Sequence, residues 1–176
     1  SGKVTSEIIR CIEDNLGSGQ WGEVTEKAKT MLVPPVTTKE KRIFIEREDA
    51  LQSSLKMGCF VMDRHHPDFL KARVMVTLFG GYFGSRLMSN IREDKGYTYG
   101  IGAGIVSYPE TGILTVSTEA ANEYVDSIIT EVYREMDKLC NDLVPQEELE
   151  MVKNYMLGDL CRSYEGPFSL SDAWIY

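Results

Sequence analysis

The sequence lacks basic runs and long apolar runs. Its 176 residues include 19 Lys and Arg against 27 Asp and Glu, a formal net charge of −8. This charge argues against nucleic acid as a main partner, because phosphate binding needs a cationic surface. No uninterrupted apolar run reaches the roughly 18 residues that suggest a membrane span. No basic and apolar leader opens the chain. We expect a soluble chain without a membrane span, in the cytoplasm or periplasm.

Residues for metal or nucleophilic chemistry are also scarce. The two histidines, His65 and His66, are adjacent and point in different directions, which makes them poor partners on one metal ion. Neither HExxH nor HxxEH occurs, and no GxSxG is present. The four cysteines have no CxxC spacing and are predicted to be buried thiols. We therefore predict no catalytic residue and no metal ligand in this segment.

Hydrophobic periodicity predicts an α+β fold, with helices layered on one face of a mostly antiparallel sheet. A short amphipathic helix is expected at 5–16, before the main body. The further elements expected, in chain order, are strands at 43–46 and 51–61, helices at 69–79 and 85–95, strands at 99–108 and 113–118, and helices at 121–140 and from 145 onward.

The region after the first helix has the composition of a linker. Gly19, Gly22, Pro34 and Pro35 combine flexibility with a stiff Pro pair. We assign 1–35 to a terminal helix plus linker and 36–176 to the main domain. The chain ends in Asp-Ala-Trp-Ile-Tyr without a terminator, so we expect a domain truncated at its C-terminus, cut from a longer protein.

Glycines mark two positions where the backbone has a special task. Gly80, Gly81 and Gly84 are expected to break the 69–79 helix, after which Ser85 caps the next helix. Such a run before a helix suggests phosphate binding, but it follows a helix and lacks the Lys of a P-loop. Gly100, Gly102 and Gly104 share one face of a strand, so we expect something to pack closely there.

The stretch 84–99, GSRLMSNIREDKGYTY, carries the most specific signal. Its pattern of G-x-R-L followed by Arg-Glu-x-x-Gly-x-x-Tyr resembles the signature of the second, non-catalytic domain of pitrilysin-family zinc peptidases. These are relatives of the mitochondrial processing peptidase and insulin-degrading enzyme. The likeness extends over nearly the whole chain, including the Pro145-Gln146-Glu147-Glu148-Leu149 helix start. It implies the metallohydrolase-like fold of that family.

The resemblance implies that Arg92 and Tyr99, seven residues apart, bind the substrate at the zinc site of the catalytic domain. The residues suit this role, because a guanidinium and a phenol are good donors to a peptide carbonyl or its developing oxyanion. Gly96 lets the chain turn between them. Tyr97 stands where relatives usually have an aliphatic residue, so Tyr99 is chosen by its spacing.

The resemblance thus implies a substrate-positioning domain of a zinc metalloendopeptidase, inactive alone. Its partners would be a peptide substrate and a homologous zinc-bearing domain or subunit. Zinc is expected in the full-length protein or partner subunit, with none bound by this segment. One alternative is a non-peptidase scaffold or assembly subunit of the same fold. Another is a small-molecule or phosphate-binding domain that uses the glycine run.

Overall fold

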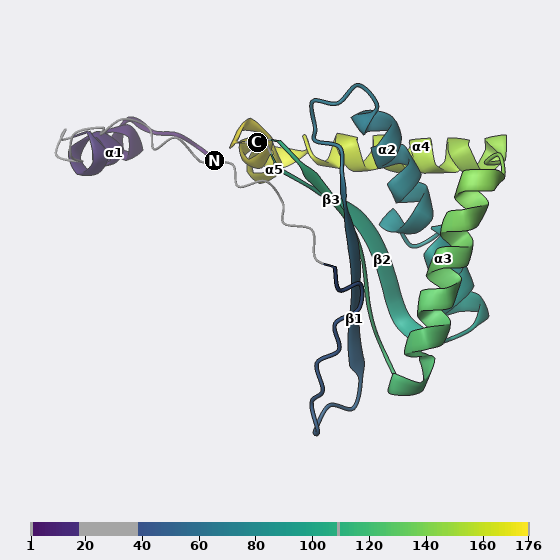
Figure 1. The fold of residues 1–176 in the computed structure, drawn as a ribbon. Coiled ribbons are helices and arrows are strands. Elements are labelled where there is room, and N and C mark those ends of the chain that lie inside the picture. The colour runs from purple at the N-terminus through teal and green to yellow at the C-terminus, as the bar shows by residue number, and fades with distance from the viewer. Residues whose placement is uncertain (1, 18–38, 109, 176) are drawn as a thin grey trace. The chain divides into compact units, whose positions relative to one another are not determined.

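The computed structural model describes residues 2–17, 39–108 and 110–175 (Figure 1). They fall into two compact units, described separately: residues 1–46 with 160–176, and residues 47–159. The predicted linker and domain boundary, at 17–38, lie almost entirely outside the described residues, so this division stays a prediction.

The described residues of the first unit include two helices and an apolar segment at 43–46 that forms no strand. Helix α1 (Ser6–Leu16) matches the predicted helix, and the Thr5 hydroxyl accepts a hydrogen bond from the Ile8 amide at its start. Helix α5 (Gly166–Ile175) was not predicted. The strand predicted at 43–46 is wrong: Ile43, Phe44 and Ile45 are largely exposed, and no described strand pairs with them. An apolar run gives a strand only where a partner accepts its backbone hydrogen bonds.

The second unit is built on a three-stranded antiparallel sheet in the order β1-β3-β2. Its strands are β1 (Ser53–Val61), β2 (Thr98–Ser107) and β3 (Gly112–Ala120). The sequence predicted all three to within two residues. Alternation explains β1, where Leu55 and Met57 pack against the core while Ser54 and Lys56 are exposed.

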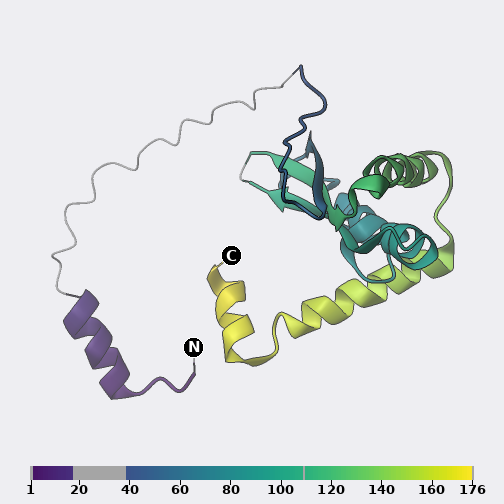
Figure 2. The same cartoon turned by 90° about the horizontal axis from the view of Figure 1, so that it is seen from below.

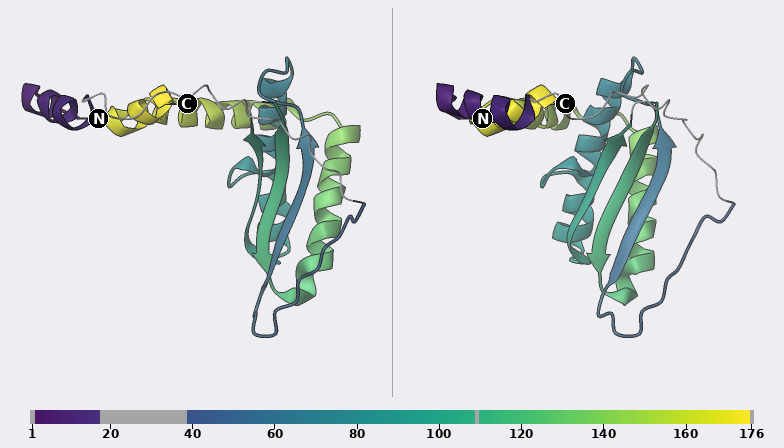
Figure 3. Two further views of the ribbon diagram at one scale, coloured as in Figure 1. Left: turned by 60° about the vertical axis from the view of Figure 1, so that its left-hand side comes forward. Right: turned by 90° about the vertical axis from the view of Figure 1, so that its left-hand side faces the viewer.

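Helices cover one face of this sheet, as the α+β prediction requires (Figures 1 and 2). The right-hand view of Figure 3 shows the strands in front with α2 and α3 behind them. The helical elements are α2 (Phe69–Val76), the π-helices η1 (Thr77–Gly81) and η2 (Met88–Asp94), the 3₁₀-helix η3 (Asn122–Tyr124), α3 (Val125–Asn141) and α4 (Gln146–Arg162). Helix α4 runs past the end of this unit at residue 159.

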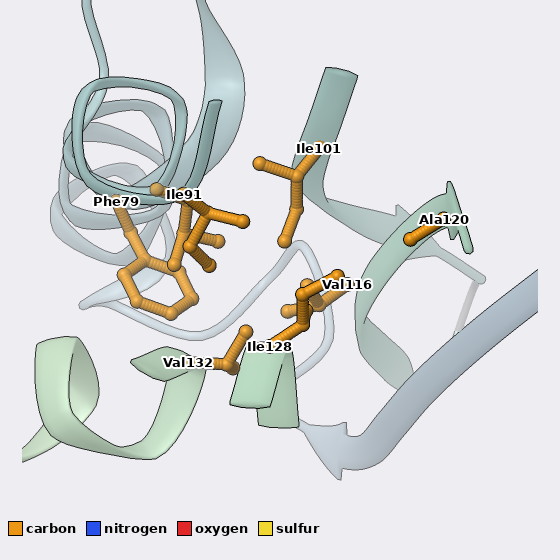
Figure 4. Close-up of a cluster of buried hydrophobic side chains, with 8 residues drawn as sticks. Phe79, Ile91, Ile101, Val116, Ala120, Ile128 and Val132 are labelled. Atoms are coloured by element: carbon orange, nitrogen blue, oxygen red, sulfur yellow. The ribbon is translucent and has the colours of Figure 1, made fainter. Parts of the chain in front are cut away.

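The core lies between the sheet and these helices (Figure 4). Its eight buried members come from η1, the start of the η2 helix, β2, β3 and α3: Phe79, Leu87, Ile91, Ile101, Val116, Ala120, Ile128 and Val132. Burying such a side chain stabilises the fold by about 1.5–3 kcal/mol for Val, Leu, Ile or Phe. The core therefore fixes the η1–η2 region against β2 and β3.

The glycine expectations need correction. Gly80 and Gly81 do not break the helix, because it widens into η1 and ends only after Gly81. The close approach occurs at Gly80, where an added Cβ would lie 2.6 Å from the Ala103 Cβ and 2.7 Å from the Ala103 nitrogen. Described atoms leave open space beside Gly100 and Gly104, whereas an added Cβ at Gly102 would lie 3.7 Å from the Gly80 carbonyl oxygen, an ordinary contact. The close packing expected on that glycine face is therefore absent at Gly100 and Gly104 within the described chain, and Gly102 has a neighbour at ordinary distance.

Two smaller expectations are also wrong. Ser85 makes no side-chain cap: its buried hydroxyl has no hydrogen-bond partner within the described part of the chain. The four cysteines are all exposed rather than buried. They lie in α1, β1, α3 and α4, each on a part of its element that no other described segment covers, so the local pattern misjudged their burial.

Substitution of Gly80 tests the close contact between η1 and β2. We expect Gly80→Ala to lower the free energy of unfolding by about 1–3 kcal/mol, the usual cost of overpacking. Gly158→Ala is the matched control: a Cβ there meets nothing within 4 Å. It should stabilise α4 by up to about 1 kcal/mol, because Ala is the better helix former. Urea unfolding measures both, and equal effects would contradict the contact.

Candidate functional site

A β-bulge brings Tyr99 out of the sheet. Thr98 pairs with Ala120 and Ile101 with Thr118, so Tyr99 and Gly100 together oppose the single residue Glu119. An extra residue of this kind re-aims a side chain and is common beside binding sites. Tyr99 is accordingly 91% exposed, although it lies within a strand.

Two buried threonines, which sequence analysis missed, hold the bulge. The Thr98 hydroxyl donates to the Glu119 carbonyl oxygen at 2.6 Å and accepts from the Gly100 amide at 3.2 Å. The Thr118 hydroxyl lies 2.8 Å from both the Thr98 hydroxyl and the Gly100 carbonyl oxygen. These bonds replace the strand pairing that the bulge interrupts. The Thr-x-Gly sequence at 98–100 was the only available signal.

Arg92 comes from the last turn of η2, and Gly96 turns the chain back toward it. Gly96 has a φ of +65°, and its amide donates to the Arg92 carbonyl oxygen at 3.1 Å. The turn predicted at Gly96 is therefore confirmed. It brings the two predicted residues together: the guanidinium carbon of Arg92 lies 5.3 Å from the centre of the Tyr99 ring.

The neighbouring phenol of Tyr97 points elsewhere. Tyr97 stacks on Tyr124 with ring centres 4.8 Å apart and packs against the core. Tyr99 is thus the exposed phenol of the pair. Residues two apart would share a face of a regular strand, so the different directions arise because Tyr97 precedes β2 and the bulge re-aims Tyr99.

A polar network anchors η2 on the side of α3. The Asn90 amide donates to Glu131 at 3.1 Å and to Glu135 at 2.7 Å. Both carboxylates belong to nearly buried residues, 6% and 4% exposed. Lys95 pairs with Glu131 at 3.4 Å, and Arg134 pairs with it at 2.7 Å. Buried charge is tolerated only when it is paired and hydrogen-bonded, as it is here.

Sequence analysis did not single out this network. The available signal was two carboxylates four residues apart, next to the apolar stripe of the 121–140 helix.

Arg86 makes a further bidentate pair with Glu148 of α4, with both N–O distances 2.8 Å. The hydrogen bond to Glu148 raises the pKa of Arg86. These contacts fix both ends of the segment that carries Arg92.

The environment of Glu131 shifts its titration. Burial raises the pKa of its carboxyl, but the hydrogen bond from Asn90 and the charges of Lys95 and Arg134 more than offset this. The net pKa lies below its ordinary value of 4.5. A carboxylate stabilised in the folded state contributes stability above that pH and loses it as the pH falls.

A shallow hollow of about 390 Å³ adjoins Tyr99 on the uncovered face of the sheet. Polar side chains from β1 and β3 line it, including Ser54, Lys56, Ser117 and Glu119. Over the described ranges, no three His, Cys, Asp or Glu side chains are grouped so as to hold a metal ion. No helix in those ranges is long and apolar enough to cross a membrane. The residues around the hollow offer hydrogen-bond donors and the exposed ring of Tyr99.

Acid titration tests the network. We expect the free energy of unfolding to fall as the pH drops below about 5, because protonation removes the favourable interactions of the Glu131 carboxylate. Glu131→Gln should be less stable at neutral pH and show a shallower acid decline. Glu150→Gln, at an exposed position of α4, is the control. Urea unfolding between pH 7 and pH 3 measures both, and parallel curves for Glu131→Gln and wild type would contradict this account.

Loss of the Thr98 hydroxyl tests the bulge. Thr98→Val preserves shape but leaves buried polar partners unsatisfied, so we expect a loss of about 1–3 kcal/mol of unfolding free energy. Thr115→Val on β3 is the control, since its hydroxyl makes only a long contact of 3.4 Å with the Gly104 carbonyl oxygen. Equal losses for the two variants would show that the hydroxyl does not hold the bulge.

The sequence of this chain is similar to a known protein family and to a curated relative. The family model described as "Peptidase M16 inactive domain" matches residues 1–156. An uncharacterised zinc protease of Bacillus subtilis, YmxG, is 26% identical over 165 residues. The match covers 94% of this chain but only 39% of that relative, so the chain spans about two fifths of its length.

Solved structures agree. The inactive domain of a Pseudomonas fluorescens M16 peptidase is 27% identical, with a TM-score of 0.59, covering 62% of this chain and 27% of that one. A Helicobacter pylori protease shares the fold with a TM-score of 0.75 at 16% identity, covering 97% of this chain and 42% of that one. The resemblance to the non-catalytic domain of pitrilysin-family peptidases is confirmed, and the chain belongs to the peptidase M16 inactive-domain family.

Proposed function

We propose that this chain is the substrate-positioning half of a zinc metalloendopeptidase, with Arg92 and Tyr99 as its peptide-binding residues. The observation that carries the proposal is their convergence: the Arg92 guanidinium lies over the ring of Tyr99, which is almost fully exposed. Two donors at one exposed point suit a peptide carbonyl, or the oxyanion that forms from it during hydrolysis. The zinc would be held by a homologous domain of the full-length protein or by a partner subunit.

The surroundings support this role. Arg92 has 25% of its side chain exposed, and within the described part of the chain its one ion pair is a long one, 3.3 Å, to the neighbouring Glu93. A contact of that length to an exposed carboxylate contributes little, so it competes weakly with a ligand. The backbone behind Arg92 is fixed by the Asn90 network and by the buried Ile91. A donor held by a rigid segment loses less entropy on binding.

The zinc-bearing full-length protein is the material for the test. We expect Arg92→Ala to lower kcat/KM for internally quenched peptides at least tenfold, which corresponds to about 1.4 kcal/mol of transition-state stabilisation. Arg92→Lys should not restore activity, because an ammonium lacks the planar fork of donors. Tyr99→Phe should lower activity through loss of its hydroxyl. Arg64→Ala, in the exposed turn before α2, is the control.

Zinc content is measured for every variant, with about one zinc per full-length chain expected. Unchanged turnover in Arg92→Ala, with zinc retained and peptide cleaved, would remove the positioning role. A full-length protein that binds no zinc and cleaves no peptide, either alone or together with its partner subunit, would instead favour the scaffold alternative.

A further inference from the structure

Phe83 is a large aromatic residue in an exposed turn, and sequence analysis gave it no role. It lies between η1 and η2 and is 63% exposed. The Arg92 guanidinium carbon lies 4.6 Å from the centre of its ring, closer than to the ring of Tyr99 at 5.3 Å. A Phe exposed to this extent gains little from burial, and its ring contacts the Arg92 guanidinium.

The turn directs its two aromatic residues to different partners. Tyr82 stacks on Tyr155 of α4, with ring centres 4.8 Å apart. Gly84 leaves room for that ring, since a Cβ at position 84 would lie 2.9 Å from it. The Ser85 amide donates to the Tyr82 carbonyl oxygen at 3.1 Å and closes the turn. Because Tyr82 stacks on α4, the next residue, Phe83, is the aromatic residue of the turn that contacts Arg92.

We propose that Phe83 is a positioning residue for Arg92, an inference that rests on the proposed role of Arg92 in peptide binding. An exposed Arg side chain samples many rotamers, and two cation–π contacts restrict it. A guanidinium that stacks on an aromatic ring uses its π-face, which leaves its N–H groups pointing outward in its plane. The N–H groups can then bind a peptide carbonyl with a smaller entropy cost, because the side chain is already ordered. Phe83 itself need not touch the peptide.

Substitutions that separate aromatic character from apolar size test this inference. In the zinc-bearing full-length protein, we expect Phe83→Leu to lower kcat/KM for internally quenched peptides about three- to tenfold, mainly in kcat. Phe83→Trp should restore wild-type values, because its ring is the better cation–π partner. Tyr133→Leu, at an exposed aromatic position of α3, should leave kcat/KM unchanged. Thermal unfolding should show that all three variants remain folded.

A spectroscopic signature tests the orientation without turnover. In the same protein, the Arg92 Nε–Hε resonance should be displaced by the two rings, move on Phe83→Leu, and return on Phe83→Trp. Assignment comes from Arg92→Lys, which removes that signal. A merely structural role for Phe83 would not give this recovery with Trp.

The outcomes separate the two proposals. If Arg92→Ala reduces kcat/KM while Phe83→Leu matches the wild type, the positioning inference is overturned and the proposed function stands. If Arg92→Ala has no effect while the resonance still moves with Phe83, the orientation is real but the proposed function fails, and this inference falls with it. If Leu and Trp reduce activity equally, the cation–π account is overturned.

Discussion

The contact between Gly80 and Ala103 brings the helical layer against the edge strand β2, and the site depends on that contact. Only a residue without a Cβ allows η1 to lie this close to the strand backbone. The chain leaves η1 at Gly81, passes through Phe83 and enters the helix that carries Arg92, so the position of η1 sets where Arg92 meets Tyr99. The buried side chains of Phe79, Ile91 and Ile101 then fix this arrangement.

The candidate site is assembled from two distortions of regular structure. The widened turns of η2 carry Arg92, where the Lys95 amide reaches back five residues to the Asn90 carbonyl oxygen at 3.2 Å. The bulge in β2 carries Tyr99. Both kinds of distortion recur at functional sites and are stabilised by their surroundings. Here the buried Asn90–Glu131–Glu135 network supports the first and the Thr98–Thr118 hydroxyls support the second.

Neighbouring aromatic residues in this arrangement make different kinds of contact. Tyr82 and Tyr97 stack on Tyr155 and Tyr124, whereas Phe83 and Tyr99 are exposed and flank one guanidinium. The stacked rings hold the backbone of their segments, and the exposed rings are available to orient Arg92. In each of the two segments, one aromatic residue stacks on another tyrosine and a second aromatic residue contacts Arg92.

The sequence by itself determined the elements with clear local patterns and the identity of the two candidate binding residues. Alternation gave β1, the amphipathic stripe gave α3, and Gly96 gave the turn, because each signal is local. The spacing of Arg92 and Tyr99 came from the resemblance. Only the tertiary structure decided which glycine is crowded, that 43–46 forms no strand, and that Phe83, Thr98 and Asn90 make the contacts described around Arg92 and Tyr99. Those outcomes depend on contacts between segments distant in the chain, for which a local pattern carries no information.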